Sequence, residues 1–295
     1  FANGQTFVVD GLQYTVTTAP EVSVNKVGTT CPTGALTIPS LVTDPGTNIA
    51  YTVRTIESQA FLNCSALTSV TLPNSLTSIG DDAFRACSGL TSVTLGDSLT
   101  FIGDDAFRAC SRLTSLTLPN SLTSIGSSAF RDCSALTSLT LPNSLISIGL
   151  QVFRGCTGLT SVTLGDSLTS IAGSAFNGCS SLTSVTLGDS LTSIAGGAFF
   201  GCSSLTSVTL PNSLTSIAGG AFQNCSALSS LTLPNSLTSI AGFTFSGCSG
   251  LTEVTVAWQT PLVISSNVFD GLTLSGITLK VPEGEIATYE AAAVW

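Results

Sequence analysis

The 295-residue sequence predicts an α/β-type solenoid that is mainly β, with about ten coils stacked on one parallel sheet. Two observations support this fold class. The chain repeats itself every 23 residues, as in 67–89, which reads LTSVTLPNSLTSIGDDAFRACSG, and a fixed period of this length is typical of solenoids. Within a repeat, apolar residues alternate with Ser and Thr, which predicts a short strand with one buried face.

The elements of one repeat follow in order. Val70 and Leu72 alternate with Thr71, so we expect a strand here whose hydroxyl-bearing side faces the solvent. Pro-Asn or Gly-Asp comes next, and both pairs favour a turn. Phe84 and Cys87 then lie three residues apart, which predicts a short helical or 3₁₀ turn that points both inward. One repeat cannot bury these residues alone, so the coils must stack.

Both ends of the stack require caps, because an uncapped solenoid exposes a sheet edge that promotes aggregation. We expect residues 1–53 to form an N-terminal cap with a divergent first repeat, in which the apolar residues of 7–16 make a hairpin. Residues 54–276 should form the solenoid of about ten coils. Residues 277–295 should form a C-terminal cap with a strand and a short helix.

The pattern L-x-x-V/L-x-L-P-x-x-L-x-x-I-x-x-x-A-F-x-x-C, repeated through 54–276, resembles the leucine-rich repeat of the BspA-like class. The flanks are similar too, since 36–61 resembles the entry repeat of that family and 279–295 resembles its exit strand and helix. The resemblance implies a right-handed leucine-rich repeat solenoid. It also implies a non-enzymatic bacterial protein, secreted or on the outer cell surface, that serves adhesion or protein binding.

Composition excludes several other functions. Only 8% of residues are charged, the net charge is −9, and no run of basic residues exists. Nucleic acids need clustered Lys and Arg, so they are not expected partners. No apolar run is long enough for a membrane span, so membrane insertion is not expected. The chain has no methionine, not even at its start, and we expect a mature segment of an exported precursor that has met the export machinery of its host.

The motif GDSL occurs three times, and its letters also name a family of serine esterases. A serine nucleophile needs a base to take its proton. The chain has no histidine, and its only lysines, Lys26 and Lys280, lie near the termini. The same columns read PNSL in other repeats, so GDSL is a duplicated turn. We therefore expect no enzymatic activity, no catalytic residue and no cofactor.

The GDSL turns also suggest a modification. Many BspA-like proteins come from bacteria of the Bacteroides group, whose exported proteins carry O-linked sugars on Ser or Thr after Asp and before an apolar residue. The resemblance therefore implies O-glycosylation of the serines in the three GDSL turns, against the alternative of unmodified turn residues. These candidates are Ser98, Ser167 and Ser190.

The cysteines form a ladder of nine at the same position in successive repeats, and a tenth, Cys31, lies in the cap region without an obvious partner. Equivalent Cβ atoms in stacked coils are separated by about the coil spacing, which is too far for a disulfide. One straight row of thiolates does not surround a metal ion either. We therefore expect nine reduced thiols buried beside the phenylalanines, and no metal site.

Four arginines share one column, each directly after its phenylalanine, with aspartates nearby in sequence. Two interpretations remain open: a stripe that binds an anionic glycan, or a solvated ladder of weak ion pairs. The aspartate pairs could at most bind calcium weakly, because each coil offers few oxygens. The candidate basic stripe is Arg85, Arg108, Arg131 and Arg154.

The outward strand positions make a nearly invariant column of threonines beside a column of serines. This face could bind a protein or glycan at a cell surface, which the family resemblance favours. Alternatives are a structural or cargo module without its own ligand, in which Ser and Thr merely suit exposed strands, and an ice-binding face. The candidate binding face is Thr71, Thr94, Thr117, Thr140, Thr163, Thr186, Thr209 and Thr232.

Overall fold

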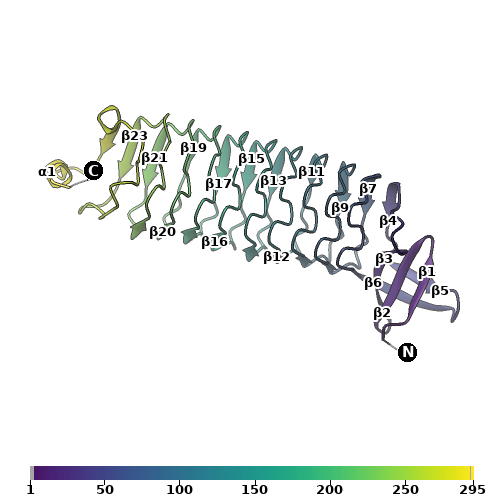
Figure 1. The fold of residues 1–295 in the computed structure, drawn as a ribbon. Helices are drawn as coiled ribbons and strands as arrows, with labels where there is room; N and C mark the ends of the chain where they lie inside the picture. The colour runs from purple at the N-terminus through teal and green to yellow at the C-terminus, as the bar shows by residue number, and fades with distance from the viewer. Residues whose placement is uncertain (1–2, 293) are drawn as a thin grey trace.

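The computed structural model describes residues 3–292 and 294–295 and shows an elongated solenoid of stacked coils (Figure 1). A small β cap closes the N-terminal end, and helix α1 (Ile286–Glu290) lies at the C-terminal end. Apart from this helix and the 3₁₀ helix η1 (Leu274–Gly276), the described residues form strands and turns. The predicted fold class, a mainly β solenoid, is therefore confirmed.

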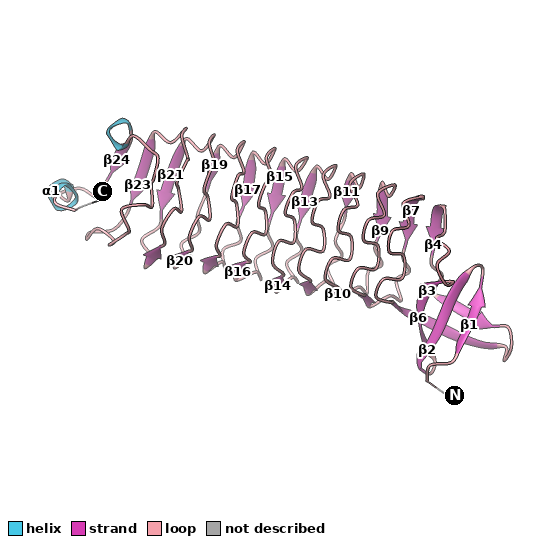
Figure 2. Ribbon diagram, viewed as in Figure 1, coloured by secondary structure: helices cyan, strands magenta, loops and turns pink. Residues whose placement is uncertain are grey.

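Each repeat contributes two strands, so the coils build two rows of parallel strands where the sequence predicted one sheet (Figure 2). The first row holds the predicted strand. Its members are β4 (Gly34–Thr37), β7 (Leu67–Thr71), β9 (Ser92–Thr94), β11 (Ser115–Leu116), β13 (Ser138–Thr140), β15 (Ser161–Thr163), β17 (Ser184–Thr186), β19 (Ser207–Val208), β21 (Ser230–Leu233), β23 (Glu253–Val256) and β24 (Thr278–Lys280).

The second row consists mainly of Ser-Ile pairs that follow the turn, and each pairs with the same two residues of the next coil except between β14 and β16. Two residues are too few to show an alternating pattern in the sequence, and only stacking in register makes them strands. Its members are β6 (Ile49–Ile56), β8 (Ser78–Ile79), β10 (Phe101–Ile102), β12 (Ser124–Ile125), β14 (Ser147–Ile148), β16 (Ser170–Ile171), β18 (Ser193–Ile194), β20 (Ser216–Ile217) and β22 (Ser239–Ile240).

The segment before each cysteine consists of single turns, including the 3₁₀ turn that the spacing predicted, and does not continue as a helix. The N–H of Cys87 donates to the carbonyl of Phe84 at 3.2 Å, as in a 3₁₀ turn. However, Asp82 and Ala86 adopt left-handed φ angles of 55° and 57°. Such residues interrupt a right-handed helix after one turn, and the chain instead bonds sideways to the next coil.

The core is a continuous stack along the solenoid axis. The phenylalanine rings from Phe61 to Phe269 stack on one another, with centroids 5.1 to 5.7 Å apart. Phe130 is fully buried between Phe107 at 5.3 Å and Phe153 at 5.6 Å. Each coil therefore depends on both neighbours for the burial of its apolar side chains.

The N-terminal cap begins with the expected hairpin, formed by β1 (Thr6–Val9) and β2 (Leu12–Thr18). Strand β3 (Glu21–Lys26) pairs antiparallel with β2 and parallel with β6, and β5 (Leu41–Asp44) pairs with the other side of β6. The cap thus extends the second row and covers its first edge.

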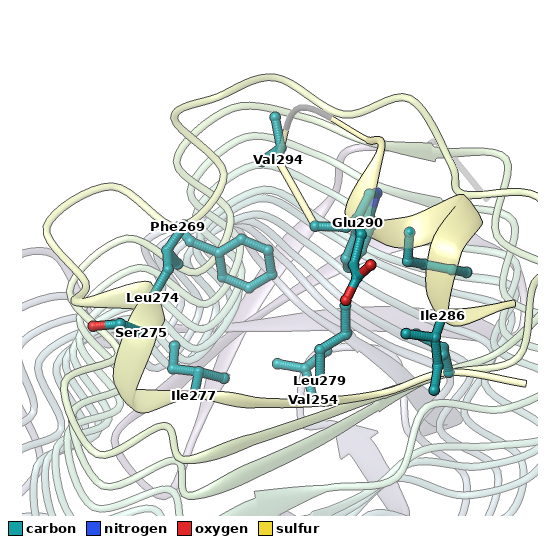
Figure 3. Close-up of a pocket in the computed structure, with 12 residues that line it drawn as sticks. Val254, Phe269, Leu274, Ser275, Ile277, Leu279, Ile286, Glu290 and Val294 are labelled. Carbon is teal, nitrogen blue, oxygen red and sulfur yellow. The ribbon is translucent and has the colours of Figure 1, made fainter.

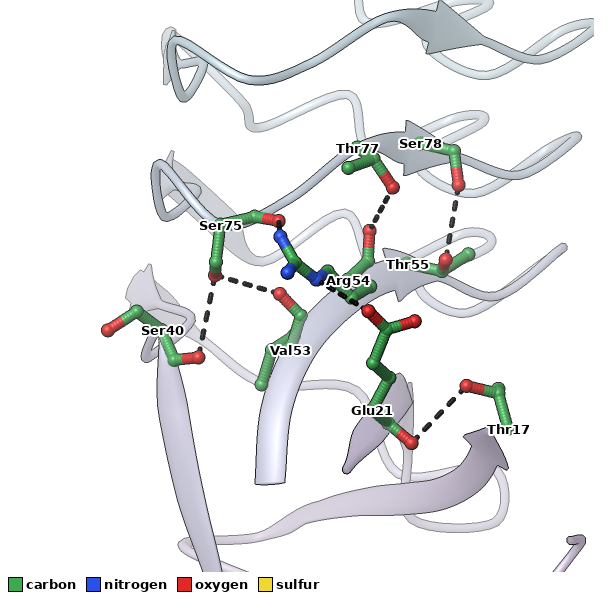
Figure 4. Close-up of polar contacts among 9 residues, drawn as sticks. All are labelled: Thr17, Glu21, Ser40, Val53, Arg54, Thr55, Ser75, Thr77 and Ser78. Carbon is green, nitrogen blue, oxygen red and sulfur yellow. Dashed lines mark hydrogen bonds and ion pairs between the residues drawn. The ribbon is translucent and has the colours of Figure 1, made fainter. Parts of the chain in front are cut away.

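Polar contacts tie this cap to the first repeat (Figure 4). Arg54 donates through Nε to Glu21 Oε1 at 3.1 Å and through Nη1 to the carbonyl of Ser75 at 3.1 Å. The Ser75 hydroxyl donates to the carbonyl of Val53 at 2.8 Å. The cap and the solenoid are therefore joined by side chains as well as by strands.

The prediction of nine reduced thiols and an unpaired Cys31 was wrong for two residues, because Cys31 and Cys64 form a disulfide with a Cα–Cα distance of 5.2 Å. The spacing argument holds between equivalent cysteines of stacked coils. Cys64, however, is the first of the ladder, and its neighbour on the open side is the connection between β3 and β4. The other eight cysteines are free and buried, as expected.

Candidate binding faces

The outward side of the first row is an exposed field of hydroxyl groups, which we call the hydroxyl face. In-register pairing aligns Thr140 with Thr163 and Ser138 with Ser161, so the columns run along the axis. All eight predicted threonines are exposed. They are Thr71, Thr94, Thr117, Thr140, Thr163, Thr186, Thr209 and Thr232. The parallel serine column is Ser69, Ser92, Ser115, Ser138, Ser161, Ser184, Ser207 and Ser230.

The hydroxyls of this face are free of intramolecular hydrogen bonds in the described residues, whereas other threonine columns use theirs. Thr91 Oγ1 donates to the carbonyl of Thr68 at 2.9 Å, and Thr100 Oγ1 donates to that of Thr77 at 3.0 Å. These flanking columns lock neighbouring coils together. The hydroxyls of the hydroxyl face do not join neighbouring coils, so they can donate to or accept from a partner directly or through water.

The arginine column is largely paired within the protein. Arg85 contacts Asp82 at 3.0 Å and Arg108 contacts Asp105 at 3.2 Å. Arg131 donates to Gln151 Oε1 at 3.1 Å; its Nε also lies 3.5 Å from Asp132 Oδ2, without hydrogen-bond geometry. Arg154 makes no ion pair among the described residues. The column therefore presents partly neutralised guanidinium groups.

The neighbouring aspartates are also engaged. Asp81 accepts the backbone N–H of Asp104 at 2.9 Å, and Asp104 accepts that of Ser127 at 2.6 Å. The carboxylates thus join consecutive coils. No cluster of three or more His, Cys, Asp or Glu suited to a metal ion occurs in the described part of the chain.

The three GDSL serines differ from their PNSL equivalents. Ser98, Ser167 and Ser190 are exposed, and across residues 3–292 and 294–295 their hydroxyls have no hydrogen-bond partner. In the PNSL turns the serine is half-buried and donates to the preceding coil, as Ser121 does to the carbonyl of Leu99 at 2.6 Å and Ser144 to that of Leu122 at 2.7 Å. The GDSL hydroxyls are thus accessible to a modifying enzyme.

The eight free thiols are buried and protonated, so they are unreactive. Each points along the core, as when Cys133 Sγ donates to the carbonyl of Phe107 at 3.2 Å. Burial raises the pKa of Cys87 from 9.0 to about 12 and shifts the pKa of Cys133 in the same direction. A protonated, buried thiol is a poor nucleophile and a poor metal ligand.

The sequence did not indicate a pocket of about 550 Å³ at the C-terminal end, between the last strands and helix α1 (Figure 3). Its walls are almost entirely apolar and include Val254, Phe269 and Leu279, with Ser275 and Glu290 as polar members. The lining residues come from both the last repeats and the C-terminal cap, and no sequence pattern shows that the two meet around a pocket. Among the described residues, Ser275 and Glu290 make no side-chain hydrogen bond with each other.

Comparison with known proteins identifies the architecture. The family model described as the BspA type leucine-rich repeat region matches residues 54–183 and 169–289, in six copies. The chain belongs to this family. The BspA-type assignment agrees with the residue pattern that spans the solenoid, and nothing in it indicates catalysis. None of the curated proteins compared with this BspA-type chain is significantly similar to it.

Solved structures show the same fold. A leucine-rich repeat protein from Bacteroides ovatus is 28% identical, with a TM-score of 0.79 over 94% of this chain and 76% of its own. A Treponema pallidum leucine-rich repeat protein is also 28% identical, with a TM-score of 0.57 over 76% of this chain and 91% of its own. A leucine-rich cell surface protein from Faecalibacterium prausnitzii has a TM-score of 0.55 at 23% identity and covers 100% of this chain and 99% of its own.

The described helices of this BspA-type protein are all too short to cross a bilayer. The family match and the structure together establish a leucine-rich repeat scaffold, a class that is generally non-enzymatic.

Proposed function

We propose that this protein is a non-enzymatic binding protein, secreted or displayed on the outer surface of a bacterium, that contacts a protein or glycan through its hydroxyl face. The observation that carries the proposal is the set of exposed serine and threonine hydroxyls without internal partners, beside columns whose hydroxyls are used. One structural relative is described as a cell surface protein, which supports the location.

The chemistry of the face favours a neutral or weakly polar partner. Its hydroxyls are regularly spaced donors and acceptors, and sugars and peptide backbones offer the complementary groups. The partly neutralised arginine column could add contacts to an anionic sugar, with Arg154 as the member without an ion pair. Each single contact is weak, so affinity would come from many contacts along the rod.

The test uses two double variants with equal charge changes. T163E/T232E places carboxylates on the first row, and S170E/S239E places them in the same two repeats on the second row. All four positions are exposed. On an array of glycans and extracellular-matrix proteins, the wild type and S170E/S239E should bind the same spots and T163E/T232E should not. Equal loss in both variants, or no binding by the wild type, contradicts the proposal.

A second candidate, ice binding, rests on the same free hydroxyls and their in-register alignment. Ice crystals grown in the protein solution would become faceted if the face matched the ice lattice. Rounded, unaltered ice crystals together with binding on the array would refute ice binding and support the adhesion proposal. A module without any ligand would be negative in both assays.

A further inference from the structure

The second row of strands is interrupted once, between repeats 136–158 and 159–181. Strands β8, β10, β12 and β14 form one run and β16, β18, β20 and β22 another, and β14 does not pair with β16. At other junctions of this row two backbone bonds flank the strand pair, for example Thr192 N–H to Thr169 O at 2.8 Å and Ala195 N–H to Ile171 O at 3.0 Å.

At this junction both flanking bonds are missing. Within the described residues, neither the N–H of Thr169 nor that of Ala172 donates to the preceding coil, and the carbonyls of Ile146 and Ile148 accept nothing. Ile146 and Leu150 are also 62% and 59% exposed. We call this gap, between 146–150 and 169–173, the seam.

A packing rule explains why the seam is here. The residue that follows each second-row isoleucine packs against a residue of the preceding coil, 22 positions earlier in the chain, as Gly103 packs against Asp81. A Cβ added to Gly103 would lie 2.7 Å from Asp81 N, and one added to Gly126 would lie 2.6 Å from Asp104 N. In these coils the residue after the isoleucine is therefore a glycine, because a Cβ there would meet the backbone of the preceding coil.

The repeats respect this rule in two ways. Up to 149, a side chain in one coil opposes a glycine in the next, as with Asp104 and Gly126. From 173 onward the order is reversed, and Gly173 opposes Ala195. Where the two arrangements meet, Leu150 opposes Ala172 and both carry side chains. The Cβ of Ala172 thus lies where the earlier coils have room only for glycine, which accounts for the missing hydrogen bonds.

The rest of the same junction is intact. Strands β13 and β15 pair in register, Gln151 N–H donates to Gly173 O at 3.0 Å, and the rings of Phe153 and Phe176 stack at 5.4 Å. The coils are therefore joined along the first row and the turn side, and open only along the second row.

We propose that the seam is a hinge about which the solenoid bends as two segments, up to 158 and from 159. The first row is interrupted at other junctions, between β11 and β13 and between β19 and β21, but at the seam its strands β13 and β15 pair in register. The first row is therefore the axis at this junction, and widening of the second row makes the hydroxyl face concave across the hinge. The face can then adapt its curvature to a partner, which a uniformly bonded solenoid could do only by breaking hydrogen bonds.

Hydrogen exchange with residue-level fragmentation tests the seam. In the wild type the amides of Thr169 and Ala172 should exchange at least about tenfold faster than those of Thr192 and Ala195. Ala172→Gly removes the Cβ that opposes Leu150, so the hydrogen bonds at the seam should form and the difference in exchange rate should disappear. Ala195→Gly, at an intact junction, is the matched control and should slow no amide. Equal protection at both junctions in the wild type, or no response to Ala172→Gly, overturns the steric account.

Small-angle X-ray scattering tests the bending. Because closing the seam removes bent conformations, Ala172→Gly should increase the radius of gyration, whereas Ala195→Gly should not. Leu150→Gly, which relieves the clash from the opposite side, should act like Ala172→Gly in both measurements. Slowed exchange with an unchanged radius of gyration in both seam variants would refute the hinge.

Discussion

The eight buried thiols should make the folded protein unusually sensitive to alkaline pH. Burial raises the pKa of Cys87, Cys179 and Cys248 to about 12, and the other five shift in the same direction from the ordinary 9.0. Because the folded pKa values lie above the unfolded ones, the stabilisation is complete below pH 9.0. It is then lost as the pH rises towards the folded values.

The magnitude follows from proton counting. Between its unfolded and folded pKa, each thiol lowers the free energy of unfolding by about 1 to 2 kcal/mol per pH unit. Eight such groups sum to roughly 10 kcal/mol per pH unit, which matches the whole stability of an ordinary domain of about 5–15 kcal/mol. We therefore expect unfolding near about pH 10.

Circular dichroism during denaturant titration measures this effect at a series of pH values from about 7.5 to about 10.5. The control is the triple variant C133A/C156A/C179A. It starts from a lower stability, but its free energy of unfolding should fall with pH about three-eighths less steeply. Stability that is constant up to about pH 10.5, or equal slopes in the two proteins, would show that the thiols are not protected as the structure indicates.

Three other perturbations test separate parts of the structure. Phe130→Ala should lower the free energy of unfolding by about 3–5 kcal/mol, because the ring is fully buried in the stack; an unchanged calorimetric transition would contradict the inward assignment. Ala109→Gly should raise stability by up to about 1 kcal/mol, since Ala109 has a φ of 58° that glycine adopts without cost. Ala129→Gly, at a buried position without a positive φ, should lower it, and the same sign in both variants would refute the argument. In protein purified from its native host, peptide mass spectrometry should find sugar on Ser98 and none on Ser75; the opposite pattern, or no sugar on any GDSL serine, would reject the modification.

The sequence alone predicted the phenylalanine stack and the first-row strand, because the residues that form them recur every 23 positions. Phe84 and Cys87 return every 23 residues, and only an inward position tolerates such a column. The second row was missed because its two-residue strands exist only through pairing with neighbours. The sequence did not show that this segment is limited to single turns, because left-handed residues, among them Ala86, cannot be recognised from residue type alone.

Three features depend on which residues lie close together in space. The disulfide joins Cys31 to the first ladder position, and the path of the cap that brings them together is not periodic. The seam does leave a trace, since IGLQ is followed by IAGS one repeat later. That trace becomes meaningful only once the structure shows that Leu150 and Ala172 occupy opposed positions. Similarly, Thr71 and Thr91 look alike in sequence, and only the hydrogen bonds distinguish a free column from a locking one.

Site-specific photo-crosslinking tests the central claim, binding through the hydroxyl face, most directly. A photoreactive amino acid replaces Thr163 on the first row or Ser239 on the second, both exposed, and the protein is irradiated with the array component that the wild type binds. We predict a covalent adduct from position 163 and none from position 239. Adducts from position 239 alone, or from both positions equally, would contradict the assignment of the hydroxyl face as the binding surface.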